Sequence, residues 1–198
     1  MRWDDAEWDA WRPEEVAARL AGIRVPWYVA AGWAIDLFLG KQRREHEDLE
    51  LGVPAARFAE VAAALGPLDF HIVTRGRVEP LSEAAALLET AHQTWGLDRS
   101  ANVWRVDLFR EPSTGGEWVS RRNSSIHLPY DELIEHTPDG IPYARPEVVL
   151  LFKAKDARPK DESDLAAVLP HLSSERRRLL AGWISLVHPG HFWLPDLA

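Results

Sequence analysis

Two carboxylates occupy alternate positions in the apolar stretch HEDLELGV, which ends at Val53. In an extended strand successive side chains alternate between two faces, so Asp48 and Glu50 point to one face while Leu49 and Leu51 point to the other. Like charges on one face repel each other, and a divalent cation held between them removes that repulsion. The pattern therefore indicates either a Mg²⁺ site or a solvated face on which the acids have no partner.

Residues that suit a polyphosphate precede the two acids. Gly32 follows an apolar strand expected over residues 27–31 and precedes a helix expected to begin near Trp33 and to end at Gly40. This order places free backbone N–H groups at a helix N-terminus, which binds anions. A basic loop that contains Arg44 and His46 then leads to the acids and supplies further phosphate donors.

The spacing Gly-Trp-Ala-Ile-Asp-x-x-Leu-Gly, followed by Arg-x-His and acid-x-acid, resembles the opening motif of the nucleotidyltransferase superfamily related to DNA polymerase beta. Within it, the chain resembles the aminoglycoside nucleotidyltransferases and their uncharacterised bacterial relatives. The resemblance is dense over residues 27–53 and thinner elsewhere. It implies that Gly32 and Trp33 face a nucleoside triphosphate and that Asp48 and Glu50 bind Mg²⁺. Many members have serine where this chain and the aminoglycoside branch have tryptophan, and Glu50 stands where aspartate is usual.

The same resemblance implies a third acid on a later strand. Residues 102–110 are rich in strand formers and contain one acid, Asp107, which shares a strand face with Arg105. One interpretation is a neighbour pair of Arg105 and Asp107 on an exposed face, which contributes little energy. The other, favoured by the resemblance, makes Asp107 a metal contact or the general base that takes the proton of an acceptor hydroxyl.

Basic residues of the C-terminal part resemble a signature of the bacterial relatives, Lys-x-Lys-x-x-Arg-x-Lys-Asp-x-x-Asp-Leu. We expect Lys153 or Lys160 to reach the nucleotide phosphates. The alternative is that Lys160 and its neighbour Arg158 pair with Asp161 and Asp164 on a helix surface and bind no ligand.

Composition restricts the remaining possibilities. The chain has 198 residues, 46% of them hydrophobic, and no cysteine, which predicts one compact domain without disulfides or thiolate metal sites. A net charge of −8 argues against a nucleic-acid polymer as substrate and favours a small or cationic acceptor, unless the charge only confers solubility. No segment has the apolar length of a membrane span, and the first residues are unlike a signal peptide, so we expect a cytoplasmic protein with no membrane partner.

Periodicity and breaker residues predict the elements. Helices are expected over residues 13–23, 54–65, 81–91 and 174–187, and from residue 146 to a break at Pro170. Strands are expected over 68–74, 92–95, 102–110 and 117–123, with a hairpin within 126–142. This order predicts an α+β fold of α/β type, a nucleotidyltransferase fold with helices packed on a mixed sheet. Residues 1–145 would form the core and 146–198 a C-terminal helical subdomain. Three N-terminal tryptophans, Trp3, Trp8 and Trp11, are expected to pack on the body or on another subunit.

The sequence therefore predicts a Mg²⁺-dependent nucleotidyltransferase. It would move a nucleoside monophosphate, AMP from ATP by default, to a hydroxyl of a small, aminoglycoside-like acceptor. Two alternatives stay open: a transferase that modifies a protein, as antitoxin members of the superfamily do, and a non-catalytic nucleotide-binding or partner-binding module in which Glu50 has spoiled the metal site. An oligomer formed through the tryptophan-rich N-terminus is a further hypothesis.

Overall fold

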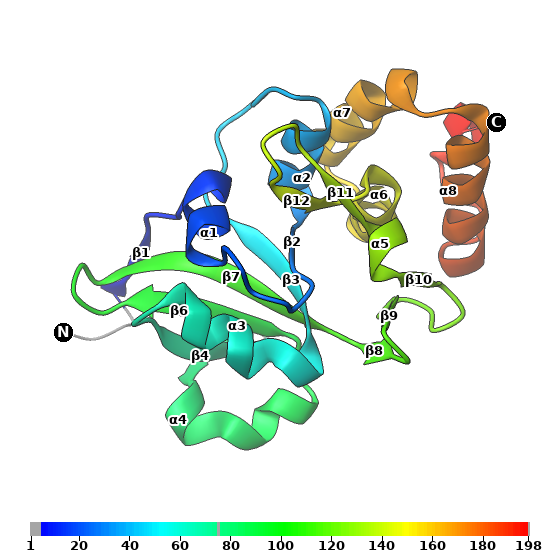
Figure 1. Cartoon of the computed structure of the whole chain (residues 1–198). Coiled ribbons are helices and arrows are strands. Elements are labelled where there is room, and N and C mark those ends of the chain that lie inside the picture. The colour runs from blue at the N-terminus through cyan, green and yellow to red at the C-terminus, as the bar shows by residue number, and fades with distance from the viewer. Residues whose placement is uncertain (1–4, 75, 198) are drawn as a thin grey trace.

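A mixed β-sheet forms the body of the protein (Figure 1). The structure is a computed structural model that describes residues 5–74 and 76–197. Within these residues nine strands form one sheet in the order β11-β12-β2-β3-β7-β6-β4-β5, with β1 pairing beside β7. Their bounds are β1 Glu7–Trp8, β2 Tyr28–Val29, β3 Glu50–Pro54, β4 Asp69–Thr74, β5 Arg77–Pro80, β6 Gln93–Asp98, β7 Val103–Glu111, β11 Ile134–His136 and β12 Pro142–Ala144. The predicted α+β fold with a mixed sheet is confirmed.

Helices and a small second sheet complete the chain. The small sheet pairs β8 (Ser113–Thr114), β9 (Glu117–Val119) and β10 (His127–Pro129). The α-helices are α1 Pro13–Arg19, α2 Ala31–Phe38, α3 Phe58–Leu65, α4 Leu81–Ala84, α5 Tyr130–Leu133, α6 Pro146–Lys153, α7 Pro159–Val168 and α8 Ser174–Val187. Short 3-10 turns cover Ala55–Arg57, Ala85–Glu89, Ala154–Asp156, Leu169–His171 and Leu194–Leu197.

The centre of the sheet is the parallel pair β3 and β7. On β7 the side chains of Val106 and Leu108 are fully buried, and on β3 those of Leu51 and Val53 are too. These four residues follow the two-residue period of a strand, so one face of each strand lies in the core and the opposite face is left for polar residues. The alternation therefore determines which face of the sheet can carry chemistry.

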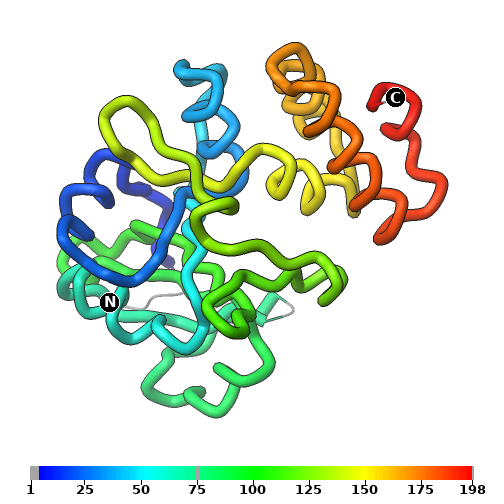
Figure 2. The backbone as a smooth tube through the Cα atoms, turned by 45° about the vertical axis from the view of Figure 1, so that its right-hand side comes forward, coloured from blue at the N-terminus to red at the C-terminus, as the bar shows by residue number. Residues whose placement is uncertain are grey.

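The C-terminal helices form a second body beside the sheet (Figure 2). Helix α6 contacts α2, α7 and α8, so it links the sheet body to the C-terminal helices. One cluster of buried apolar side chains extends from Trp11 to Leu197 and includes residues of both parts. The division of the chain at residue 146 stays a prediction.

Several elements differ from the expectation at their ends. Pro54 is the last residue of β3, paired with Glu111, so helix α3 begins only at Phe58. Trp8 lies on the two-residue strand β1, which was not among the expected elements, and the centre of its ring lies 5.2 Å from that of Trp95. A two-residue strand is too short to show a period, which is why the pattern did not predict it.

The three N-terminal tryptophans have different outcomes. Trp8 packs against the aromatic rings of the sheet, and Trp11 is 7% exposed and belongs to the main core cluster. Trp3 lies outside the described residues. Among the helices that the structure describes, none combines the length and the apolar character needed to cross a lipid bilayer.

Candidate functional site

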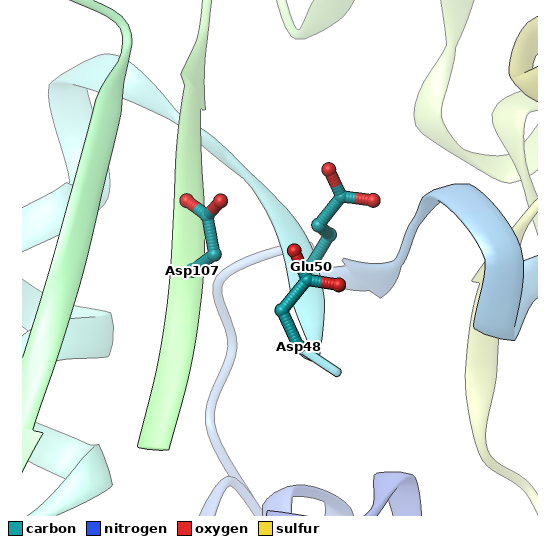
Figure 3. A group of neighbouring side chains, drawn as sticks. All are labelled: Asp48, Glu50 and Asp107. Carbon is teal, nitrogen blue, oxygen red and sulfur yellow. The ribbon is translucent and has the colours of Figure 1, made fainter. Parts of the chain in front are cut away.

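Three carboxylates meet where β3 and β7 run side by side. Glu50 pairs in register with Asp107, and the backbone N–H of Asp107 donates to the carbonyl oxygen of Leu49 at 2.9 Å. One carboxylate oxygen from each of Asp48, Glu50 and Asp107 lies within 4.8 Å of the others. Figure 3 shows the three carboxylates directed to the same side of the two strands. The structure thus brings the acid pair of the motif together with the acid of the later strand.

Asp48 does not lie on a strand, contrary to the expectation, because β3 begins at Glu50. The neighbouring strand β2 ends at Val29 and the chain then turns into α2, so β2 does not extend beside Asp48. The alternation of faces nevertheless extends to this segment, since Leu49 and Leu51 are fully buried on the opposite side.

Asp107 is 1% exposed and has an unsatisfied oxygen. Its Oδ2 accepts a hydrogen bond of 2.6 Å from the Gln93 side chain, whereas its buried Oδ1 has no partner among the described residues. Arg105 instead contacts Asp9 at 2.5 Å and Asp98 at 3.2 Å, so the alternative pair of Arg105 with Asp107 does not form. A buried carboxylate oxygen without a donor is costly, and a cation would satisfy it.

Burial and mutual repulsion disfavour the charged forms of these acids. Burial, with a further contribution from Asp48, raises the pKa of Glu50 to about 7. Burial also raises the pKa of Asp107 well above its usual value, and the charge of Glu50 adds to that shift. An all-oxygen donor set, an orphaned buried oxygen and closely spaced like charges are features that fit Mg²⁺. The residues present therefore suit the metal that the motif implies.

Gly32 is the second residue of α2, and the basic loop folds directly over it. A Cβ at this position would overlap Nη2 of Arg44 and would lie 2.7 Å from both Cε1 and Nδ1 of His46. The ring of His46 also packs 4.6 Å from that of Trp33. The absence of a side chain at Gly32 thus allows Arg44 and His46 to approach the helix N-terminus, where the N–H groups are unsatisfied by the helix itself.

Asp36 holds this loop in place from within α2. The residue is 2% exposed, and its Oδ2 lies 2.6 Å from Nε2 of His46. It also accepts from the backbone N–H of Arg43 at 3.2 Å and from Nε of Arg43 at 3.1 Å. The guanidinium of Arg43 continues to Asp164 of α7. Asp36 therefore connects the loop of the candidate phosphate site to the C-terminal helices.

The two candidate lysines have different surroundings. Nζ of Lys153 lies 2.7 Å from Asp161 and 3.0 Å from Asp164, and its side chain is only 9% exposed. Lys160 is exposed beside the cleft and forms no ion pair in the part of the chain that the structure describes. Arg158, by contrast, pairs with Asp161 at 2.9 Å. The surface pairing considered for this helix thus exists for Arg158 and is absent for Lys160.

These residues border a cleft of about 640 Å³ between the sheet and the C-terminal helices. Asp48, Glu50, Gly32 and Trp33 line it, as do all the candidate phosphate-binding residues: Arg44, His46, Lys153 and Lys160. A cleft of this size accommodates a nucleotide or a drug-sized molecule. The residues that the motifs indicate, though far apart along the chain, therefore share one cavity, except for Asp107, which is buried behind its wall.

Other residues of the cleft were not identified from the sequence. Glu111 is on the same strand face as Asp107, four residues further along β7, and it pairs with Arg121 at 3.0 Å. The strand period alone would have indicated Glu111 as a second acid on that face. Tyr28 also lines the cleft, and its ring occupies the space above Gly52, where a Cβ would overlap it. A glycine inside a strand signals such a close approach.

Comparison with known proteins supports the resemblance seen in the motif. The family described as aminoglycoside-2''-adenylyltransferase has a model that matches residues 14–90. Proteins described as 2''-aminoglycoside nucleotidyltransferase, from Escherichia coli and from Klebsiella pneumoniae, are each 28% identical over 79 residues, 40% of this chain and 45% of the relative. The chain thus matches less than half the length of these curated relatives. The predicted resemblance to aminoglycoside nucleotidyltransferases is confirmed.

Similar solved structures extend over most of the chain. The solution structure of the antibiotic-resistance factor ANT(2'')-Ia is 14% identical with a TM-score of 0.57, covering 87% of this chain and 89% of that one. The crystal structure of the lincosamide antibiotic adenylyltransferase LnuA, lincomycin-bound, is 16% identical with a TM-score of 0.55, covering 81% and 98%. The predicted nucleotidyltransferase fold is therefore confirmed.

Proposed function

We propose that this chain is a Mg²⁺-dependent nucleotidyltransferase that moves a nucleoside monophosphate, AMP from ATP, to a hydroxyl of a small acceptor. The observation that carries the proposal is the convergence of Asp48, Glu50 and Asp107 within 4.8 Å of one another beside a cleft. The similarity to aminoglycoside and lincosamide adenylyltransferases supports the same class of reaction.

In this reaction the acceptor oxygen forms a bond to the α-phosphorus, and the bond from that phosphorus to the bridging oxygen of pyrophosphate breaks. Mg²⁺, when bound, stabilises the charge that develops on the phosphate oxygens. Asp48 and Glu50 would hold the metal. Asp107, whose Oδ1 accepts no hydrogen bond from the residues that the structure describes, would contact the metal or take the proton of the acceptor hydroxyl. Pyrophosphate then leaves with its negative charge.

The phosphates would lie at the N-terminus of α2. The free N–H groups near Gly32 and the side chains of Arg44 and His46 face that position together. Lys160 is an exposed cation at the cleft and is available for a direct phosphate contact. Lys153 is already paired with two carboxylates, so we assign it a supporting contribution to the local positive potential. Catalysis in this arrangement is mostly alignment and electrostatic stabilisation.

Calorimetry with a non-hydrolysable ATP analogue tests the metal site. We expect binding that requires Mg²⁺ and that is lost in Asp48→Ala. The matched control is Asp139→Ala, because Asp139 is exposed in the turn between β11 and β12 and does not line the cleft. Binding that does not depend on metal, or that persists in Asp48→Ala, would support a non-catalytic module and contradict the proposal.

A pyrophosphate-release assay tests the transfer itself. The first acceptors to assay are aminoglycosides and lincosamides, since these are the classes named for the similar proteins. Release that needs ATP, Mg²⁺ and a hydroxyl-bearing acceptor, and that Asp107→Asn abolishes, is the expected result.

A further inference from the structure

The far end of the cleft, beyond the three acids, has a composition of its own. On β7, Asp107, Phe109 and Glu111 share one face, so each lies about 6.6 Å beyond the one before it. We call the distal end the part of the cleft lined by Phe109, Glu111, Arg121, Arg122, Phe152 and Lys155. Asp107 does not line the cleft itself, whereas Glu50, its register partner on β3, does, so an acceptor that reaches the acids through the cleft has the distal end beside it.

The one buried carboxylate there is already neutralised. Glu111 is 4% exposed, and its two oxygens accept hydrogen bonds of 3.0 and 3.1 Å from the guanidinium of Arg121. The same guanidinium lies 4.9 Å from the ring centre of Phe109 and 5.1 Å from that of Phe152. A bidentate pair of this kind is strong and geometrically fixed. Glu111 is therefore occupied and is not free to bind an ammonium group of a ligand.

Arg122 differs in that the nearby carboxylates of Asp156 and Glu111 act on its charge without a direct ion pair. Its guanidinium lies 5.3 Å from the ring centre of Phe152, and across the described residues it forms no ion pair. Lys155 pairs with the exposed Asp156 at 3.7 Å. With Asp156 included, three cations (Arg121, Arg122 and Lys155) face two carboxylates in this region, so the distal end has a positive surplus.

We propose that the distal end binds an acceptor that carries an anionic group on a planar or apolar body, with Arg122 contacting the anion and the phenylalanine rings contacting the body. This inference rests on the proposed transferase function and narrows its substrate class. Aromatic faces beside a guanidinium bind flat groups, and an unpaired arginine binds carboxylate or phosphate. Acceptors with several ammonium groups would meet Arg122 and Lys155 as like charges, so we expect them to bind weakly.

Three probes with the same aromatic body and different charge test the proposal: para-nitrophenyl β-D-glucuronide, the matching glucoside and the matching glucosaminide. Their affinities are measured by calorimetry at low ionic strength in the presence of Mg²⁺ and a non-hydrolysable ATP analogue. We expect the glucuronide to bind at least about fivefold more tightly than the glucosaminide, with the glucoside between them. In Arg122→Gln this order should disappear, and in the charge-matched control Arg24→Gln, exposed and outside the cleft, it should remain.

Three outcomes would overturn the inference. The first is that the glucosaminide binds as tightly as the glucuronide, or that none of the probes binds. The second is that Arg122→Gln leaves the preference intact. The third is that Arg122→Gln weakens binding of the ATP analogue instead, which would assign the distal cations to the triphosphate.

Failure of the proposed function is distinguishable from failure of this inference, because the analogue would then not bind with Mg²⁺ at all. Rapid transfer to polycationic aminoglycosides would support the function and refute the acceptor class.

Discussion

Replacing Gly32 by alanine tests whether the loop over α2 binds the nucleotide phosphates. The added Cβ would lie 2.7 Å from two ring atoms of His46, whereas carbon atoms pack best at about 3.5–4.0 Å, so the ring has to move by about 1 Å. Because that ring is held by Asp36 at 2.6 Å and packs on Trp33, the movement breaks its hydrogen bond. The substitution therefore displaces His46, and Arg44 with it.

The expected magnitudes follow from these contacts. Alanine gains about 1 kcal/mol of helix propensity over glycine, and loss of the contact between His46 and Asp36 costs about 1.5–3 kcal/mol, so Gly32→Ala should destabilise the fold by only about 0.5–2 kcal/mol. Loss of the aligned phosphate donors should weaken binding of the ATP analogue by at least about tenfold, since tenfold corresponds to about 1.4 kcal/mol. Binding thus falls while the fold persists.

Urea denaturation and calorimetry with Mg²⁺ and the ATP analogue measure the two effects separately. Gly182→Ala is the matched control, because Gly182 lies within α8 and a Cβ there meets nothing within 4 Å. The control should gain about 1 kcal/mol of stability and bind as the wild type does. If folded Gly32→Ala binds the analogue with wild-type affinity, the phosphates do not lie at this helix N-terminus.

Three further predictions concern the carboxylates. The pKa of Glu50 is raised to about 7 from 4.5, so the metal-free fold is stabilised by this group below about pH 4.5 and loses up to about 3 kcal/mol as the pH rises through 7. In thermal denaturation from pH 5 to 8, the stability of Glu50→Gln should decline less than that of the wild type, and Mg²⁺ should stabilise the wild type more at high pH. Equal pH slopes in both proteins would contradict this. Asp107→Asn removes a buried charge that faces Glu50, so at pH 8 it should raise the stability of the metal-free protein by about 1 kcal/mol. It should also lower the rate of pyrophosphate release at least about a hundredfold, and an unchanged rate would exclude Asp107 from the chemistry. Asp36→Ala leaves Arg43 and His46 without their buried partner. In urea denaturation it should lower the free energy of unfolding by about 3–5 kcal/mol, against less than about 0.5 kcal/mol for the exposed Asp139→Ala. A decrease below about 1 kcal/mol would show that the loop is held by other contacts.

Local pattern was sufficient for the central strands and the acid pair, whereas Asp107 was favoured as the third acid only by the family resemblance. The alternation of Leu49, Leu51 and Val53 with Asp48 and Glu50 indicates the buried and the polar face, and the structure places those leucine and valine side chains fully in the core. A period of two residues is a property of the extended backbone itself, so it can be read without knowing the neighbouring strands. The sequence thus determined which faces carry acids.

Partner choice among the charged residues could not be predicted in this way. Arg43 and Asp164 are 121 positions apart, yet they are in contact, and Lys153 is paired with Asp161 and Asp164 although it resembled a free phosphate ligand. Arg158 is paired too, whereas Lys160 beside it is not. Local spacing describes the surface of one helix and says nothing of which carboxylates another helix brings near.

The sequence by itself therefore determined the central strands and the longer helices, the buried faces of those strands, and the order of glycine, basic loop and acids that resembles the nucleotidyltransferase motif. Only the tertiary structure decided that Asp107 faces Glu50, that Asp36 holds His46 over Gly32, and which cations of the cleft form direct ion pairs. The physical reason is that backbone periodicity is local, whereas ion pairing and burial depend on distances that exist only after distant segments have packed together.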